Sequence, residues 1–351
     1  MTSDAKDTRR KGTAGTHRRP TTYDVAKQAG VAQSTVSYVL NDVRTVTIPQ
    51  ETRDRVLEAA RTLGYRPNAA AASLRMGRTN TIGLISDEIA TTPFAGKIIK
   101  GAQDYAWEQG KILMIINTDG DADIAAAAIT LLLERRVDGI IYAAMHHQEV
   151  LLPTTLRETP AILLDCFVAD RSLPSVTPDE SGGGYTATQT LSAHGHRRIG
   201  FINLQPDLPA AVGRLAGYHA ALREAGIALD PALVRHGNSR ADSGYALTRE
   251  LMQLTAPPTA IFCGNDNIAM GAYDALRELG LAIPNDVAVI GFDNQEIIAA
   301  YLRPALTTLE LPHYAMGQWA VRYLLDHTEH SADEAVPQVV LPCPLVMRDS
   351  L

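Results

Sequence analysis

Two hydrophobic patterns divide the 351-residue chain near residue 80. Between residues 22 and 63, apolar side chains recur three or four positions apart, the spacing that places them on one face of an α-helix. Beyond residue 80, short continuous apolar runs alternate with amphipathic stretches, which is typical of buried parallel strands separated by helices. The sequence therefore predicts a small all-α domain followed by a larger α/β domain.

Three helices are predicted in the first part. The first is expected to begin at a capping Thr22, and Gly30 permits a tight turn before the second. The third is expected from about residue 49 to residue 63, with Gly64 as its stop. Two short helices joined by a Gly-containing turn form a helix-turn-helix, whose second helix fits the major groove of DNA. The inward positions are Val25, Ala26 and Ala29, then Val36, Val39 and Leu40, then Val56, Leu57, Ala60 and Leu63.

The outward face of the second helix is polar and uncharged. Hydrogen-bonding side chains near the N-terminus of such a helix reach base edges in the major groove. A helical domain that binds protein is the alternative, but hydroxyl and amide groups beside local positive charge favour DNA. The outward residues are Gln33, Ser34, Thr35, Ser37, Tyr38 and Asn41.

The charge distribution points to a nucleic-acid partner for the first part alone. Residues 1–80 hold 14 Lys and Arg against 7 Asp and Glu, a net of +7, whereas the remainder holds 18 against 32, a net of −14. A cationic front on an anionic body indicates that the front meets a polyanion. Residues 1–20, rich in Arg, Lys, Thr and Gly, are expected to be a disordered and solvated basic tail.

Residues 67–79 are predicted to be a linker with a conditional helix. Its Ala-rich stretch, about residues 68–76, is shorter than the ~12–15 residues that an isolated helix needs in water, so we expect helix only where something supports it. Leu74 beside Arg75 suits an apolar wedge in the minor groove of DNA, with Arg holding phosphates. Packing of Leu74 on the next domain is the alternative.

The α/β part is expected to form open, doubly wound sheets, with enough strands for two of them. The predicted strands are TIGLIS, KILMIIN, VDGIIYAA, PAILLD, RRIGFIN, TAIFCGND and DVAVIGFD. In such sheets, ligands bind beyond the carboxyl ends of the strands. The polar residues just past the strands are Asp87, Glu88, Asn117, Asp165, Asn265, Asp266, Asp293 and Asn294, and Arg214 lies in the helix after GFIN.

An acid-and-amide cleft with one Arg suits a ligand that carries many hydroxyls. Carboxylates accept hydrogen bonds from sugar hydroxyls, while Arg and Asn donate to hydroxyl and ring oxygens. The alternative is that Asp and Asn after a strand only cap the next helix, and we expect Asp266 to be mostly structural.

Other signals are set aside. GGGYTA (182–187) loosely matches a dinucleotide fingerprint but lacks the acidic residue about twenty positions on, so close helix packing is its expected role. The three isolated Cys and the HGH at 194–196 do not have metal-ligand spacing, and no nucleophile–base constellation is visible. We expect no metal, no cofactor and no enzymatic activity. Without a signal sequence or a membrane-spanning run, the protein is expected to be cytoplasmic and nucleoid-associated.

The segments TTYDVAKQAGVAQSTVSYVLN, LGYRPN and AASLRMGRT together resemble the headpiece and hinge of the LacI/GalR family of bacterial transcription regulators. The resemblance covers about residues 21–78 and implies that Gln33, Ser34 and Tyr38 read bases. Two departures are Tyr38, where many members carry Arg, and Ala32, where Ser often caps the recognition helix. The predicted DNA-binding set is Thr22, Tyr23, Gln33, Ser34, Thr35, Ser37, Tyr38, Asn41, Leu74 and Arg75.

The body resembles the two-lobed effector domain of the same family, which is similar to periplasmic sugar-binding proteins. The matching segments are SDEIATTPFAG, LLD, GRLAGY, GND and GFDN. The resemblance implies an N-lobe of about residues 80–177 and 309–335, and a C-lobe of about 178–308 and 336–351. Pro178 and Ser239 stand where some members place aromatic residues, which disfavours a stacked nucleobase. The implied effector-binding residues are Asp87, Phe94, Asp165, Arg214, Asn265 and Asp293.

The predicted function is a sequence-specific repressor of carbohydrate-utilisation genes that a sugar effector releases from a palindromic operator. The tail PQVVLPCPLVMRDSL is predicted to be a closing strand, and no Leu heptad follows it. A coiled-coil tetramer is therefore not indicated, and we expect a homodimer on an inverted repeat of double-stranded DNA. The first alternative is a family member that needs a nucleobase or phosphoprotein corepressor. The second is a plain sugar-binding module, against which the cationic front end argues.

Overall fold

The computed structural model describes residues 19–41, 43, 46–66, 79–92, 95–327 and 335–351. The chain forms two units, residues 1–77 and residues 78–351. Nearly all of the predicted tail, the linker residues 67–78 with Leu74 and Arg75, and Phe94 lie outside the described residues.

The first unit contains the predicted helix-turn-helix and third helix: α1 (Thr22–Ala29), α2 (Gln33–Leu40) and α3 (Gln50–Thr62). Its core is built from Val25, Val36 and Val56, all fully buried, with small alanines between the helices. Small side chains let three short helices approach closely enough to exclude water from this core. Gly30 and Gly64 follow α1 and α3 with φ angles of 65° and 62°, the left-handed conformation that favours glycine.

Two local predictions for this unit are wrong. The N-cap of α1 is Thr21, because its hydroxyl accepts from the Asp24 backbone N–H while the Asp24 carboxylate accepts from the Thr21 N–H, a reciprocal capping box. In α3 the inward residue is Ala59, and Leu57 is 36% exposed. At 100° per residue, Ala59 and Ala60 share a face with Val56, whereas Leu57 turns away from it.

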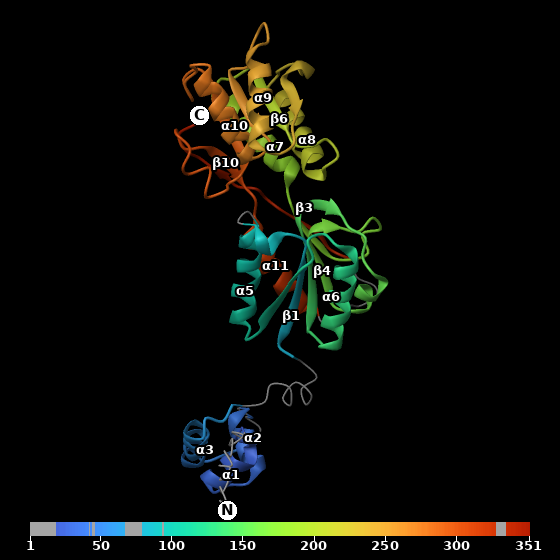
Figure 1. The fold of residues 1–351 in the computed structure, drawn as a ribbon, viewed down its shortest axis with the longest axis vertical. Coiled ribbons are helices and arrows are strands. Elements are labelled where there is room, and N and C mark those ends of the chain that lie inside the picture. Colours follow the sequence, from blue (N-terminus) through green and yellow to red (C-terminus); the bar gives the residue numbers. More distant parts are fainter. Residues whose placement is uncertain (1–18, 42, 44–45, 67–78, 93–94, 328–334) are drawn as a thin grey trace, which may run out of the picture. The chain divides into compact units, whose positions relative to one another are not determined.

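The second unit contains two six-stranded sheets, one in each lobe (Figure 1). The first-lobe sheet has the order β11-β5-β4-β3-β1-β2, and its described pairings are parallel. Helices α5 and α11 pack on one face of this sheet, and α6 packs on the other. The strands are β1 (Thr81–Ser86), β2 (Ile112–Asn117), β3 (Gly139–Glu149), β4 (Ala161–Phe167), β5 (Ser175–Pro178) and β11 (Gln338–Leu341); the helices are η1 (Ile89–Thr91), α5 (Gly96–Glu108), α6 (Ala122–Glu134), η2 (Thr154–Glu158) and α11 (His313–Asp326).

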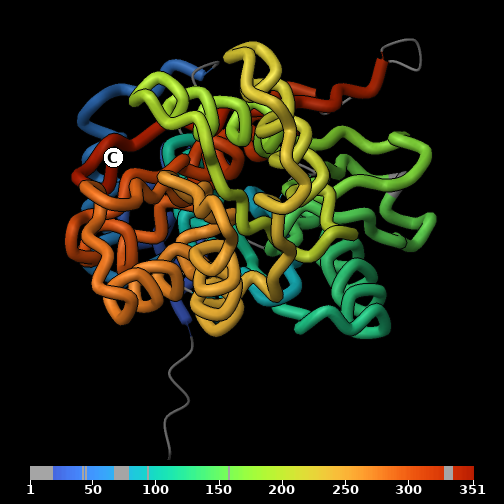
Figure 2. Tube along the Cα trace, turned by 90° about the horizontal axis from the view of Figure 1, so that it is seen from above, coloured from blue at the N-terminus to red at the C-terminus, as the bar shows by residue number. Residues whose placement is uncertain are grey.

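The second-lobe sheet has the order β12-β10-β9-β8-β6-β7, and its β12 is antiparallel to β10. Helices α7 and α8 cover one face and α9 and α10 the other; in Figure 2 the yellow-green α7 and α8 lie on the opposite side of this lobe from the orange α10. The strands are β6 (Ile199–Asn203), β7 (Val234–His236), β8 (Ala260–Cys263), β9 (Ala288–Asp293), β10 (Thr307–Glu310) and β12 (Leu345–Val346); the helices are α7 (Glu180–Ala193), α8 (Pro209–Glu224), η3 (Pro231–Leu233), α9 (Ala241–Met252) and α10 (Asp266–Glu278).

The predicted lobe boundaries near the C-terminus need correction. Strand β10 pairs with β9 and so keeps residues 309 and 310 in the second lobe. Strand β11 pairs in parallel with β5, from Gln338 opposite Ser175 to Leu341 opposite Pro178, which places it in the first lobe. The chain therefore crosses between the lobes three times: after β5, after β10 and after β11. Both tail strands are short and apolar, so hydropathy did not reveal which sheet each one joins.

Within the part of the chain that the structure describes, no helix is both long enough and apolar enough to cross a membrane.

Candidate effector cleft and DNA-reading helix

Helix α2 exposes the polar face that the sequence predicts. Gln33, Ser34 and Tyr38 are all exposed, the last at 39%. The Gln33 amide donates to the Thr22 hydroxyl oxygen at 2.6 Å, so the structure brings together two predicted residues from different helices. Ala32 is the N-cap of α2 and supplies no side-chain acceptor, which leaves the N–H groups of the first turn available to an outside acceptor such as a phosphate.

The remaining predicted residues of this face lie around it. Tyr23 is 64% exposed on α1. The Asn41 amide donates to the Ser37 carbonyl at 2.6 Å and so ties down the end of α2. Thr35 and Ser37 are half-buried on the sides of the same helix.

A cleft with a volume of about 280 Å³ lies between the two lobes, at the carboxyl ends of their strands. Four of the six predicted effector residues line it: Asp165, Arg214, Asn265 and Asp293. This placement follows from topology, since parallel strands of one sheet deliver their carboxyl ends to the same edge. The other described lining residues are Met145, His146, His147, Glu180, Leu204, Gln205, Leu208, Ala210, Ser239 and Leu311.

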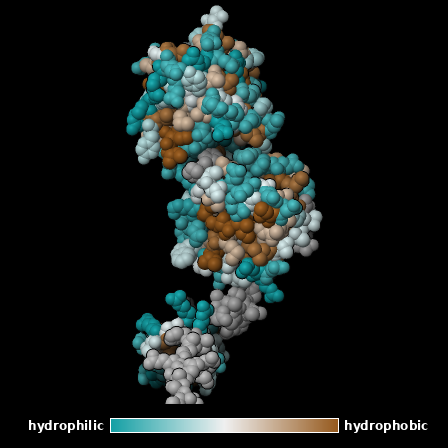
Figure 3. Space-filling view, in the orientation of Figure 1, coloured by the Kyte–Doolittle hydropathy of each residue, from teal (hydrophilic) through white to brown (hydrophobic). Residues whose placement is uncertain are grey.

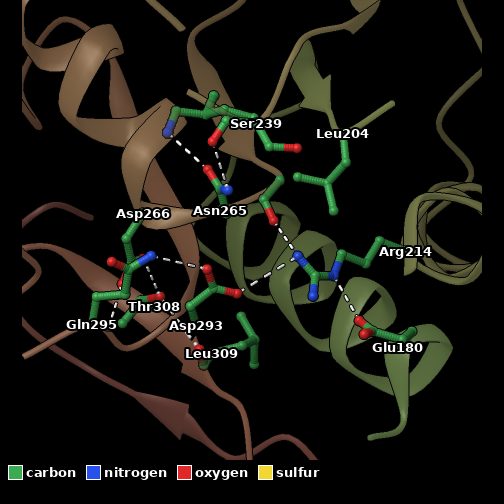
Figure 4. A network of polar contacts seen from close by, with 12 residues as sticks. Glu180, Leu204, Arg214, Ser239, Asn265, Asp266, Asp293, Gln295, Thr308 and Leu309 are labelled. Atoms are coloured by element: carbon green, nitrogen blue, oxygen red, sulfur yellow. Dashed lines mark hydrogen bonds and ion pairs between the residues drawn. The ribbon is translucent and has the colours of Figure 1, made fainter. Parts of the chain in front are cut away.

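Arg214 is the centre of a buried ion network (Figure 4). Its side chain comes from α8, and its Nε donates to the Glu180 carboxylate at 2.6 Å. Its Nη1 donates to the Gly264 carbonyl and lies 3.8 Å from Asp293 Oδ1. The guanidinium also stacks on the Phe292 ring, with its carbon 3.7 Å from the ring centroid. Burial opposes the charge, but Glu180 and Asp293 raise the pKa of Arg214 above its ordinary value.

Asp293 and Asp266 are linked through Gln295. The Gln295 amide donates to Asp293 at 3.2 Å, and the Gln295 backbone N–H donates to Asp266 at 2.7 Å. Asp266 also accepts from the Thr308 hydroxyl at 2.7 Å, and burial raises its pKa to about 7. Burial raises the pKa of Asp293 despite the nearby Arg214. Asp266 is not a lining residue, and its bonds hold the loop after β9 in place, as the sequence analysis expected of a structural residue.

Asn265 has both of the roles that the sequence left open. Its side-chain oxygen accepts from the Ile268 backbone N–H at 2.8 Å and so caps α10. Its amide nitrogen donates to the Ser239 carbonyl at 3.0 Å. The side chain also lines the cleft, so capping fixes the position in which it faces a ligand.

Two first-lobe side chains at the cleft have polar atoms that form no hydrogen bond with the described residues. Asp165 is 2% exposed, has a φ angle of 56° within β4, two residues before the strand ends, and its Oδ1 accepts no hydrogen bond from the described residues. Burial raises the pKa of this carboxyl well above its usual range, and Glu180 adds to the shift. Both ring nitrogens of His147 are likewise without a partner among the described residues, and burial lowers its pKa, which favours the neutral imidazole. A buried acceptor without a partner is costly unless a ligand or an ordered water supplies the donor.

Asp87 does not line the cleft. One of its carboxylate oxygens accepts from the Met145 backbone N–H at 3.0 Å, and the other accepts from the Glu88 N–H at 2.6 Å. Because Met145 is a lining residue, Asp87 shapes the wall from behind. The prediction of Asp87 as a direct effector ligand is therefore not supported by this arrangement.

The sequence analysis missed Glu180, the strongest partner of Arg214. Glu180 is the first residue of α7, next to its N-cap Asp179, and is 6% exposed. Its place depends on the glycines that follow: a Cβ at Gly184 would overlap the backbone of Arg214, and one at Gly183 would meet the Phe292 ring at 2.6 Å. Helix packing is thus the role of the GGGYTA segment. The available signal was the pair of acidic residues, Asp179 and Glu180, directly after β5.

Comparison with known proteins bears on both units. The family described as bacterial regulatory proteins, lacI family, matches residues 21–68. The family described as periplasmic binding proteins and sugar binding domain of LacI family matches residues 79–347, most of the chain. The protein belongs to the LacI family. As a LacI-family member it is a DNA-binding transcription regulator, which confirms the resemblance and the two-part fold that the sequence predicted.

Individual relatives cover nearly the whole of this LacI-family chain. The HTH-type transcriptional repressor PurR of Aliivibrio salmonicida (strain LFI1238) is 34% identical, over 90% of this chain and 96% of its own. A transcriptional regulator CelR–cellobiose complex is 31% identical with a TM-score of 0.64, covering 95% of this chain and 100% of its own. A lac repressor dimer bound to operator and the anti-inducer ONPF is 28% identical with a TM-score of 0.78, over 95% and 99%.

Proposed function

We propose that this LacI-family regulator is a repressor that binds an inverted-repeat operator as a homodimer and is released by a sugar. The observation that carries the sugar assignment is Asp165: a buried carboxylate oxygen in the cleft that lacks a protein donor. Sugar hydroxyls are donors of the kind that such an oxygen accepts, and neutral His147 beside it can both donate and accept.

The lining of the cleft favours a sugar over a nucleobase. Its described residues include no Phe, Tyr or Trp on which a flat base would stack, and Ser239 stands on the wall where an aromatic ring would serve that purpose. The CelR relative was solved with cellobiose, a sugar, which supports the same ligand class. Asp165, Arg214, Asn265 and Asp293 are the proposed effector contacts, with Asp87 behind them.

We assign DNA reading to the exposed polar face of α2, with Gln33, Ser34 and Tyr38 toward the bases. Tyr23, Thr35, Ser37 and Asn41 are placed toward the backbone or in support. An inverted repeat follows from symmetry, because a two-fold dimer presents two identical recognition helices.

The homodimer is assigned to the apolar side of the first lobe. Brown side chains gather on this lobe in Figure 3. The exposed apolar residues of α5 and β2 in this lobe include Trp107, whose exposed fraction is 70%, Ile112 with 52% and Ile115 with 39%. Ile112 and Ile115 lie on β2, an edge strand. Contiguous exposed apolar surface beside an open sheet edge is typical of a protein interface. The lac repressor relative was solved as a dimer on its operator.

An electrophoretic mobility shift on the promoter nearest the gene itself tests the proposal. The purified protein should retard this DNA, and one member of a panel of mono- and disaccharides should release it. The Gln33→Ala variant should lose specific retardation, whereas Gln50→Ala, the same change on α3 where Gln50 bonds Asp54, should keep it. Tighter binding with a nucleobase, and no release by any sugar, would replace the inducer assignment with a corepressor.

A further inference from the structure

The described lining of the cleft contains more acidic than basic side chains. Its described lining residues include three carboxylates, Asp165, Glu180 and Asp293, and one cationic side chain, Arg214. All four residues are at most 9% exposed, so little solvent screens them from one another. His147, the adjacent titratable group, is held toward its neutral form by burial.

Arg214 is already paired before any ligand arrives. Glu180 lies 2.6 Å from its Nε, Asp293 lies 3.8 Å from its Nη1, and the Gly264 carbonyl accepts from the same Nη1. A phosphate or carboxylate on a ligand requires a cation whose charge is not neutralised. Here such a group would instead meet the carboxyl groups of Asp165 and Glu180 and a guanidinium whose charge Glu180 already balances.

The fold places Glu180 at this position. A Cβ at Gly213 would lie 2.6 Å from the Cβ of Glu180, so glycine lets α8 approach the first turn of α7. The same close approach brings the Glu180 carboxylate against the Arg214 guanidinium. A longer helix separation would leave Arg214 free for a ligand anion.

We propose that Glu180 is a specificity-determining residue that makes the cleft select an uncharged effector and reject phosphorylated or carboxylated ones. This inference rests on the proposal that the cleft holds the effector, and it narrows that effector to a neutral polyhydroxyl compound. Glu180 acts through Arg214, because it cancels the only cation in the described lining. The Asp165 Oδ1, which has no hydrogen-bond partner among the described residues, completes the selection, since it accepts from hydroxyls and supplies no cation to an anionic group.

The first test compares matched ligand pairs on the wild-type protein. Isothermal titration and thermal shift are measured with glucose, galactose and cellobiose, and with their charged counterparts glucose 6-phosphate, glucuronate, galactose 6-phosphate and cellobiose 6-phosphate. The neutral member that binds should do so at least about tenfold more tightly than its charged counterpart, because like-charge juxtaposition is strongly unfavourable in a buried site. Equal or tighter binding of the charged counterpart would overturn the inference.

The second test needs no known effector. Inorganic phosphate is titrated against sodium chloride of equal ionic strength, and the shift of the melting temperature is measured for wild type, Glu180→Gln and Glu250→Gln. Glu250 pairs with Arg235 and is 56% exposed, so Glu250→Gln removes the same charge outside the cleft. Only Glu180→Gln should gain a phosphate-specific stabilisation. Identical phosphate responses in all three proteins would overturn the role of Glu180, and circular dichroism checks that each variant is folded.

The two proposals fail in different ways. Adenine and hypoxanthine, each beside its nucleoside monophosphate, extend the panel to another ligand class. Binding of a neutral base but not its nucleotide would overturn the sugar assignment and support the charge selection. Binding of a sugar phosphate in preference to the neutral sugar would support the sugar assignment and overturn the charge selection. If Glu180→Gln does not fold, the wild-type comparison of charged and neutral pairs still decides.

Discussion

The two lobes of the effector unit share a topology but contribute opposite kinds of groups to the cleft. In the second lobe, Arg214 and Asn265 are engaged by neighbouring protein groups. In the first lobe, Asp165 Oδ1 and both nitrogens of His147 have no partner among the described residues. The second lobe thus holds a rigid, preorganised half-site, and the first lobe holds groups whose hydrogen-bond partners come from a ligand or from water.

This difference suggests how a ligand acts on the protein. A ligand seated on the second lobe gains little by rearranging it, since its polar groups already have fixed partners. The same ligand relieves the cost of the buried first-lobe acceptors when its hydroxyls reach them. We therefore expect effector binding to draw the first lobe toward the second, with a coupling of the usual ~1–3 kcal/mol.

Arg214→Leu should have the largest effect, because it leaves the buried Glu180 and Asp293 carboxylates without their cation. Removing one partner of a buried ion pair typically costs about 3–5 kcal/mol, so we expect a loss of that size in the free energy of unfolding measured in urea, together with loss of effector binding. Arg235→Leu is the control, as its pair with Glu250 is partly exposed and should cost at most about 1 kcal/mol. Equal losses of unfolding free energy in the two variants would show that the buried pairs of Arg214 stabilise the second lobe no more than one partly exposed ion pair does.

The same substitution in the two halves of the network should change stability in opposite directions. Asp266→Asn replaces an acceptor of two hydrogen bonds, from Thr308 and Gln295, and should lower the free energy of unfolding by about 1–3 kcal/mol. Asp165→Asn removes a buried charge that has no donor on Oδ1, and should raise it by about 1 kcal/mol at pH 8 while weakening effector binding. Destabilisation by both changes would contradict the contrast between the lobes.

The pH dependence of stability should show that both buried carboxyls, Asp165 and Asp266, have raised pKa values. The folded-state pKa of Asp165 is raised, so the folded protein holds its proton at a pH where the unfolded chain has released it. Its contribution to the free energy of unfolding therefore falls as pH rises above the ordinary value of about 3.9, until the folded group also ionises. Asp266, with a pKa raised to about 7, contributes in the same direction between about pH 4 and pH 7.

Urea denaturation of wild type and Asp165→Asn between pH 5 and pH 8 checks this expectation. The stability advantage of the variant should grow with pH, because the wild type alone carries the carboxyl that ionises at a cost. A difference that stays constant over this range would mean that Asp165 has the same pKa in both states.

Lys97→Gln should have the smallest effect. From α5 of the first lobe, its ammonium lies 3.1 Å from Glu296 and 3.0 Å from Glu310, both in the second lobe. The lysine is about one-third exposed, so solvent screening limits its stabilisation to at most about 1 kcal/mol. We expect unchanged stability within that margin and a change of a few-fold in effector affinity by titration calorimetry. Lys100→Gln, whose partner Asp104 lies within the same helix, should change neither.

Periodicity alone predicted much of the fold. The alternation of apolar runs and amphipathic stretches gave the doubly wound arrangement, since helix and strand periods are local properties. The destination of the two tail strands is not local: β11 joins β5, more than 150 residues away in the chain, and its hydropathy resembles that of β12. The N-cap of α1 was misplaced by one residue because Thr21 and Thr22 are chemically identical, and only backbone geometry chooses between them.

The site was predictable where it depends on strand ends. Asp165 lies near the end of β4, Asp293 ends β9 and Asn265 follows β8, and the carboxyl ends of these strands meet in the cleft. Asp87 follows a strand too, but the Met145 and Glu88 backbone N–H groups occupy its oxygens. Glu180 escaped because its importance comes from Arg214, 34 residues further on, and from glycines that matter only once two helices touch.

The three chain crossings between the lobes limit how the effector unit can move. Two lobes joined by one segment can twist, slide or rotate against each other. Three adjacent crossing segments of fixed length oppose both the twisting and the sliding. The motion that remains is a hinge rotation of one lobe against the other about a single axis through the three crossing segments. A ligand bound in the cleft should therefore act by changing the angle between the two lobes, and the size of its effect should depend on how far the lobes open.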